Sequence, residues 1–269
     1  MNAPMNAPVN APVNPTGYRK LAARYSDLTS GMLAPERTPL ADAWLGLPMT
    51  FVAGATNAGG LLAVGQYTSH MSGIISSAAD QAVLGAMDLV LAAAGALTAF
   101  VVGAAVSSLL VNWGRLHVAG REYSLPLTLE ALLLLAFAAI GPFTRTSGLM
   151  LGLAVAVLCF IMGLQNATVT KMSGAKIRTT HMTGIVTDIG IELGKLFYSN
   201  RRRRRGVGAP LVMADREKLK LLSYFLAAFF FGGVVGAVGF NYIGFVFAVP
   251  LALLVLALAG PSALRILLR

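Results

Sequence analysis

Two histidines lie in nearly identical sequences, and histidine is the side chain whose charge changes most readily near neutral pH. The first lies in the stretch TSHMSGIIS around His70, and the second lies in TTHMTGIVT around His181. Each could serve a proton relay or a gate, or could form ordinary hydrogen bonds at a helix end. Ser72 and Thr183 could cap a short helix, whose positive N-terminus would favour an anionic or zwitterionic solute over a cation.

A second motif, Gly-x-x-Asn-Ala, precedes each histidine and contains Asn57 in the first copy and Asn166 in the second. Both asparagines fall within apolar segments, where an amide must bond to another helix or border a polar cavity. Interhelical packing and solute or water binding therefore both remain open for them. Because two blocks recur in the same order, the sequence predicts an internal duplication.

The composition indicates that lipid, rather than water, surrounds most of the chain. Of 269 residues, 56% are apolar and 12% charged, and the mean hydropathy is +0.71. This excludes a soluble enzyme or a free nucleic-acid-binding protein, despite the net charge of +10. The sequence has no nucleophile elbow, zinc-protease motif, phosphate-binding loop or paired-cysteine motif, so we expect no enzyme activity and no cofactor. Cys159, the only cysteine, is expected in the core.

Six apolar segments have about the length, roughly 20 residues, that a helix needs to cross a bilayer. We expect Asn241 and Tyr242 to form a tight turn between the last two segments. Asp88 and Glu130 lie close to segment ends, so we expect both at the interface. The segments are 44–66, 86–111, 125–142, 147–168, 219–239 and 241–260.

The basic residues predict the orientation. If the N-terminus is cytoplasmic, all of the 21 lysines and arginines except Arg145 lie on the cytoplasmic side. Trp44, Trp113 and Tyr123 then lie at that interface, where amphipathic rings are enriched. We therefore expect six spans with both termini on the cytoplasmic side.

Each repeat contains three spans, and an odd number makes the second copy enter from the opposite face. The predicted fold is an all-α polytopic membrane protein with two inverted three-helix repeats. Asp42 and Asp80 enclose 37 residues without a charged side chain, more than one span requires. The segments 67–80 and 179–197 are therefore expected to be short half-helices folded back into the protein, or interfacial helices.

The predicted organisation has three parts. Residues 1–43 form a disordered Asn-Ala-Pro-rich tail, residues 44–262 form the membrane domain, and residues 263–269 form a short basic tail. Within the membrane domain, repeat one covers 44–142, repeat two covers 147–260, and a basic cytoplasmic loop covers 169–218.

Two charged features of that loop need an interpretation. The five consecutive arginines are expected to orient the chain and to attract anionic lipid headgroups, rather than nucleic acid. His181, Asp188 and Glu192 share a helical face but lack a tightly spaced third strong ligand, so we expect no metal site. The arginines are Arg201, Arg202, Arg203, Arg204 and Arg205.

These motifs resemble the YoaK family of bacterial membrane proteins, also named domain of unknown function 1275. The resemblance covers residues 44–262, and TTHMTG is its most specific part. The family often has Asp at the position of Asn57 and Asn at the position of Ile74, so this chain is less polar in repeat one. The resemblance implies a polytopic inner-membrane protein and no established activity.

Because of the duplication, our main hypothesis is a transporter or permease for a small solute. Its transport would be driven by a gradient or would be passive. The solute would bind between the repeats near Asn57, Asn166 and the two histidine motifs. The alternative is a membrane scaffold that docks lipid or a partner without transport. The sequence names neither the solute nor the oligomeric state, and a homo-oligomer is compatible with it.

Overall fold

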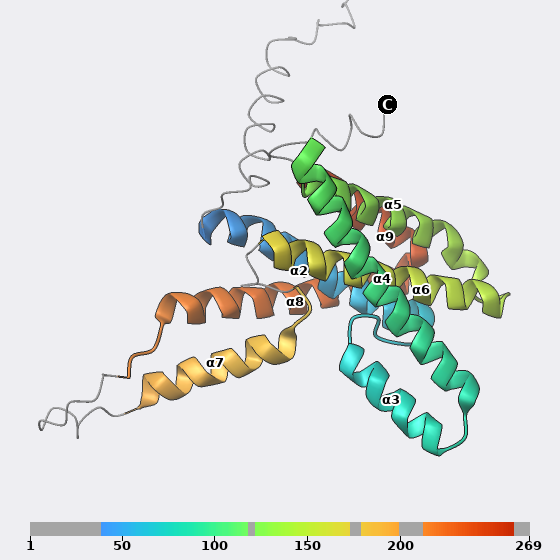
Figure 1. The fold of residues 1–269 in the computed structure, drawn as a ribbon, viewed down its shortest axis with the longest axis horizontal. Coiled ribbons are helices and arrows are strands. Elements are labelled where there is room, and N and C mark those ends of the chain that lie inside the picture. Colours follow the sequence, from blue (N-terminus) through green and yellow to red (C-terminus); the bar gives the residue numbers. More distant parts are fainter. Residues whose placement is uncertain (1–38, 118–121, 173–178, 199–211, 261–269) are drawn as a thin grey trace, which may run out of the picture.

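The computed structural model describes residues 39–117, 122–172, 179–198 and 212–260, and it is helical wherever regular structure is assigned in these ranges. Figure 1 shows the long helices crossing one another, with α3 and α7 extending away from the crossing. The elements are α2 (Pro39–Val64), α3 (Met71–Val83), α4 (Met87–His117), α5 (Ser124–Ile140), η1 (Gly141–Phe143), α6 (Gly148–Met172), α7 (Met182–Phe197), α8 (Arg216–Tyr242), η3 (Gly244–Phe247) and α9 (Ala248–Ala259).

Five helices are long and apolar enough to cross a membrane, which confirms a multi-pass helical protein. They overlap the first five predicted spans. The sixth predicted segment is a shorter apolar stretch, Gly244–Ala259, made of η3 and α9.

Two predicted boundaries are shifted. Helix α2 begins at Pro39, ahead of the predicted start at 44, while residues 1–38 of the predicted tail lie outside the described residues. The predicted turn at Asn241 and Tyr242 is wrong, because both residues belong to the last turn of α8. The chain turns instead at Gly244, whose φ of 73° is a left-handed conformation that glycine adopts without strain.

Two pairs of long helices cross at glycines. Helix α2 packs on α8, and α4 packs on α6. In each crossing, a glycine of one helix faces the backbone carbonyl of a phenylalanine in the other, and an added Cβ would lie within 3.0 Å of that oxygen. Such small residues let backbones approach closely in a membrane. The pairs are Gly54 with Phe229, Gly232 with Phe51, Gly103 with Phe160, and Gly163 with Phe100.

The helices of the α4–α6 pair run in the same direction. Gly103 of α4 faces the carbonyl oxygen of Phe160 in α6. Further along both helices, the hydroxyl of Ser107 in α4 lies 2.8 Å from the hydroxyl of Thr168 in α6. Residue numbers therefore increase together along both helices.

The same is true of α2 and α8. Gly232 lies at Phe51, and one turn later Gly236 lies at the backbone of Ala55. By contrast, α5 and α9 are antiparallel at their ends, because the Ser124 hydroxyl near the start of α5 donates to the carbonyl oxygen of Ala259 at the end of α9 (3.0 Å).

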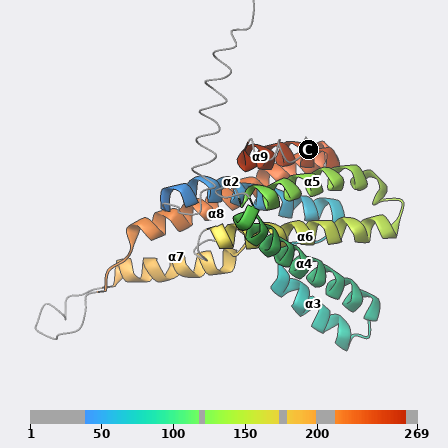
Figure 2. The same ribbon diagram turned by 45° about the horizontal axis from the view of Figure 1, so that its top comes forward.

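The core lies where α6 meets α2, α4 and α5. Helix α6 is buried along much of its length, whereas α4 and α8 expose most of their apolar side chains. Figure 2 shows α5 and α9 on one side of the bundle and α3 and α7 on the other. Such exposed apolar helices are expected where the surrounding solvent is lipid.

Candidate functional site

Asn57 binds the segment that connects α2 to α3. Its side-chain oxygen accepts hydrogen bonds from the backbone N–H of Ser69 (3.3 Å) and from the Ser69 hydroxyl (2.9 Å). The amide oxygen thus fixes the residue just before His70, in the segment that leads into α3. The amide nitrogen of Asn57 has no acceptor among the described residues.

Asn166 makes the equivalent contacts in the second copy, and more of them. Its oxygen accepts from the N–H of Thr180 (3.2 Å) and the hydroxyl of Thr179 (3.3 Å). Its nitrogen donates to the hydroxyl of Thr180 (2.7 Å) and to the carbonyl oxygen of Met162 (2.8 Å). Both asparagines therefore hold the start of a short helix.

These bonds require the chain to fold back along the preceding helix. Asn57 lies seven residues before the end of α2, and Asn166 lies six residues before the end of α6. At 1.5 Å per residue, Ser69 and Thr180 therefore lie about 10 Å back from the ends of α2 and α6. Each short helix thus begins beside the interior of a long helix.

Each histidine is the residue that precedes a short helix, and its ring lies against the glycine three positions later. An added Cβ on Gly73 would lie within 3.0 Å of the His70 ring, and one on Gly184 would meet the His181 ring in the same way. Neither histidine side chain bonds to the helix N-terminus. Both side chains are exposed.

The predicted capping by Ser72 and Thr183 is wrong. Both residues lie inside the first turn, because helices α3 and α7 begin one position earlier, at the methionine that follows each histidine. Both side chains are exposed there, so they remain available to a ligand.

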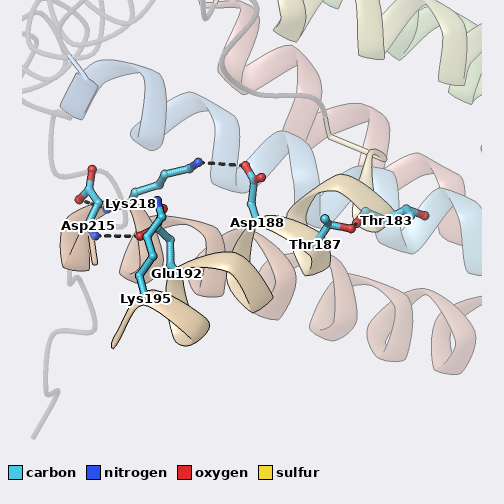
Figure 3. A network of polar contacts seen from close by, with 7 residues as sticks. All are labelled: Thr183, Thr187, Asp188, Glu192, Lys195, Asp215 and Lys218. Atoms are coloured by element: carbon cyan, nitrogen blue, oxygen red, sulfur yellow. Dashed lines mark hydrogen bonds and ion pairs between the residues drawn. The ribbon is translucent and has the colours of Figure 1, made fainter. Parts of the chain in front are cut away.

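A polar network joins α7 to the start of α8 (Figure 3). Glu192 is buried and accepts from the Lys195 ammonium (2.8 Å) and from the backbone N–H of Asp215 (2.8 Å). These two hydrogen bonds lower the pKa of Glu192. Asp188 pairs with Lys218 across the hairpin (3.1 Å).

That network involves two members of the face that we considered for metal binding. Glu192 is directed to Lys195 and to the backbone of α8, and Asp188 to Lys218 (Figure 3). Within the described ranges, no three histidine, cysteine or acidic side chains converge on one point. The face therefore fastens a helical hairpin.

Glu130 is buried inside the protein, although it lies close to the start of a predicted span. It lies in the second turn of α5 with no exposed surface, and neither carboxylate oxygen has a hydrogen-bond partner among the described residues. The side chain is buried because α5 packs against both α6 and α9. Asp88, in contrast, is exposed in the first turn of α4, as expected near a helix end.

Other buried polar groups lie on the neighbouring helices. The amide nitrogen of Gln165 in α6 donates to the carbonyl oxygen of Met49 in α2 (2.8 Å). Its amide oxygen and the hydroxyl of Thr50 have no hydrogen-bond partner among the described residues. Sequence reasoning missed Gln165, although it precedes Asn166 in the repeated motif.

The sequence also matches a family model over residues 45–260, described as a protein of unknown function, DUF1275. The chain belongs to this family. No curated protein and no solved structure matches the chain. The match includes both asparagine and histidine motifs, as the resemblance implied. The family's function is not known, so the role of these residues rests on their geometry.

Some predicted residues fall outside the described ranges. The run Arg201–Arg205 is one of them, as are the C-terminal residues 261–269. The phenylalanine–glycine spacing at the helix crossings was a signal that could have been found. The pattern Phe-x-x-Gly occurs at residues 51–54, 100–103, 160–163 and 229–232.

Proposed function

We propose that the chain is a six-span transporter or permease for a small solute, built from two inverted repeats and located in a bacterial inner membrane with both termini cytoplasmic. The observation that carries this proposal is the pairing of equivalent helices. Repeat one contributes α2, α3, α4 and α5, and repeat two contributes α6, α7, α8 and α9 in the same order.

The equivalent of α2 in the other repeat is α6, and the equivalent of α8 is α4. Replacing each helix by its equivalent therefore turns the α2–α8 pair into the α6–α4 pair. Both pairs are parallel, and both cross where a glycine meets a phenylalanine carbonyl. The same exchange converts α5–α9 into itself, and these two helices are antiparallel. A two-fold axis in the membrane plane has these consequences, which supports the inverted arrangement.

Helix directions also support six crossings. With six spans, the first and fifth run in one direction, and so do the second and fourth, whereas the third and sixth oppose each other. This is the relation between α2 and α8, between α4 and α6, and between α5 and α9. Under this proposal, η3 and α9 together form the sixth crossing.

The solute would bind where the two short helices begin. In both views of the fold, the starts of α3 and α7 lie near each other at the centre of the molecule (Figures 1 and 2). His70, Ser72, His181 and Thr183 are exposed there, and the amide nitrogen of Asn57 has no acceptor in the part of the chain that the structure describes. Rocking of one repeat against the other would alternate access to this site.

Flux measurements in proteoliposomes with a panel of small anionic, zwitterionic and cationic solutes test this function. We expect at least one solute to be transported, and we expect His70→Ala and His181→Ala to abolish its flux. The third histidine supplies a matched control, because His117 stacks on Trp113 at the end of α4 and should be dispensable. Equal flux in all three variants would refute the proposed site.

One observation favours the alternative function, a membrane scaffold that does not transport. The amide of Asn166 is fully engaged with its own repeat, as expected for a motif that only packs the bundle of a scaffold protein. Thiol labelling of His70→Cys in a Cys159→Ser background separates the two functions. Labelling from water supports a hydrated site, whereas protection supports packing.

The partners remain proposals as well. Arg201–Arg205 would attract anionic headgroups on the cytoplasmic side, each charge contributing about 1 kcal/mol near the surface. Vesicle binding of a peptide containing this run, compared between neutral and anionic lipid, tests the contact.

A further inference from the structure

Glu130 is an unpaired acid inside a membrane-spanning helix. It lies in the candidate span Ser124–Phe143, has no exposed surface, and has two oxygens without a hydrogen-bond partner in the described chain. A buried carboxylate without a partner is strongly unfavourable, and ionisable groups within membranes are rare and functional. The side chain therefore needs either a proton or a second conformation that supplies a partner.

The position of Glu130 follows from the packing of α5. It belongs to a buried stripe, spaced alternately by four and three residues, that begins at Tyr123 and continues through Leu127, Leu134 and Phe137. The Tyr123 hydroxyl lies 3.5 Å from the carbonyl oxygen of Lys171 near the end of α6.

The short connection at 141–147 makes α5 and α6 antiparallel neighbours. Seven residues along α5 from Tyr123 therefore correspond to about seven residues back along α6 from Lys171, about 10 Å away. This register places Glu130 near the level of Leu164 and Gln165, and the amide oxygen of Gln165 also has no partner among the described residues. Gln165 donates to the carbonyl oxygen of Met49, and the hydroxyl of the next residue, Thr50, likewise has no partner in the described ranges.

Among the residues that the structure describes, no cation lies at this level to neutralise the carboxylate. Among the elements that pack on α5, three contain no titratable side chain: α9, η1 and η3. Helix α6 contributes Cys159 and Lys171, and α4 contributes Asp88, Arg115 and His117. Both Lys171 and Arg115 contact Tyr123, and thus lie at the far end of the stripe.

We propose that Glu130 is a proton-binding site of the membrane domain. Its carboxylate takes up one proton to become the neutral acid while α5 and α6 are closed, and releases that proton when the helices part and water enters beside Gln165. This inference rests on the proposed transport function only in making the proton the coupling ion. The binding of the proton itself is independent of any solute.

Dicyclohexylcarbodiimide tests the site directly. This apolar reagent enters membranes and reacts with protonated carboxyl groups in apolar surroundings, where the carboxyl oxygen adds to the central carbon and the acid proton moves to nitrogen. We expect peptide mapping of the full-length protein in liposomes to find the adduct on Glu130, and labelling to slow as the pH is raised. Absence of an adduct on Glu130, while other carboxyl groups react, would overturn the proposal.

Two variants make the assignment specific. Glu130→Gln resembles the neutral acid in size, so we expect it to fold with the thermal stability of the parent and to lose this adduct completely. Glu122→Gln is the matched control, because Glu122 is equally buried but lies 3.9 Å from the Arg115 guanidinium. It should retain the adduct on Glu130. Loss of the adduct in the control as well would contradict the assignment.

A proton-flux measurement separates this inference from the proposed function. In proteoliposomes with an internal pH dye, solute addition should drive proton movement in the parent protein and not in Glu130→Gln. If Glu130 is labelled but no solute moves, the proton site stands and the transport proposal fails. If solute moves with the same proton flux in Glu130→Gln, the coupling role of Glu130 is refuted.

Discussion

Replacing Gly103 by alanine tests the helix crossings on which the fold depends. Gly103 lies in α4, and its Cα faces the carbonyl oxygen of Phe160 in α6. An added Cβ would come within 3.0 Å of this oxygen, closer than real Cβ atoms approach other atoms. The obstacle is backbone on a buried helix, so the two helices must separate.

The expected loss follows from two opposing effects. Overpacking a well-packed site costs about 1–3 kcal/mol, because backbones shift and the neighbouring contacts weaken. Alanine also favours a helix by up to about 1 kcal/mol over glycine. Gly95 in the same helix supplies this second effect alone, since an added Cβ there meets nothing within 4 Å.

The measurement is the thermal stability of purified Gly103→Ala and Gly95→Ala proteins in the same detergent. We expect Gly103→Ala to be less stable than Gly95→Ala by about 1–3 kcal/mol. A second pair on α6, Gly163→Ala and Gly152→Ala, should repeat the result, because only Gly163 faces a carbonyl, that of Phe100. Equal stability within both pairs would refute the close helix crossing.

Three further predictions concern side chains. Asn57→Asp keeps the oxygen that Ser69 needs, whereas Asn166→Asp loses two donated hydrogen bonds, so only the second should reduce thermal stability, by about 1–3 kcal/mol. Glu192 has a lowered pKa in the folded protein, so its stabilisation of the α7–α8 hairpin is present above the ordinary value of 4.5 and is lost as the pH falls through the lowered value. Hydrogen exchange of the hairpin should show this loss, and Glu192→Gln should remove its pH dependence. The hydroxyl pair of Ser107 and Thr168 should give a coupling of about 0.6 kcal/mol in a double-mutant cycle, and no coupling would contradict the parallel register of α4 and α6.

Most helices could be predicted from the sequence because their signal is local. A long apolar stretch must be helical in a membrane, and the repeated asparagine and histidine motifs marked the two short helices. The end of the chain was less predictable. The segment 241–260 has the composition of a full span, but α8 continues through Tyr242, and only a left-handed glycine at 244 ends it.

Glu130 could not be placed from sequence because its burial depends on packing between helices. An acid a few residues after the start of an apolar segment is typical of an interface, and nothing nearby indicates that α6 and α9 cover it. Similarly, Gly103 and Gly163 are two among the 29 glycines in the sequence, and their role becomes clear only when α4 lies on α6. The pairing of the helices determines which glycines form the close crossings.

The most direct test of the inverted repeats is the sidedness of the two helical hairpins. In a Cys159→Ser background, Asp80→Cys labels the α3–α4 hairpin and Glu217→Cys labels the α7–α8 hairpin, and both positions are exposed. An impermeant thiol reagent applied to sealed, oriented vesicles should reach these two cysteines from opposite faces of the membrane. Labelling of both from the same face would contradict the two-fold relation between the repeats.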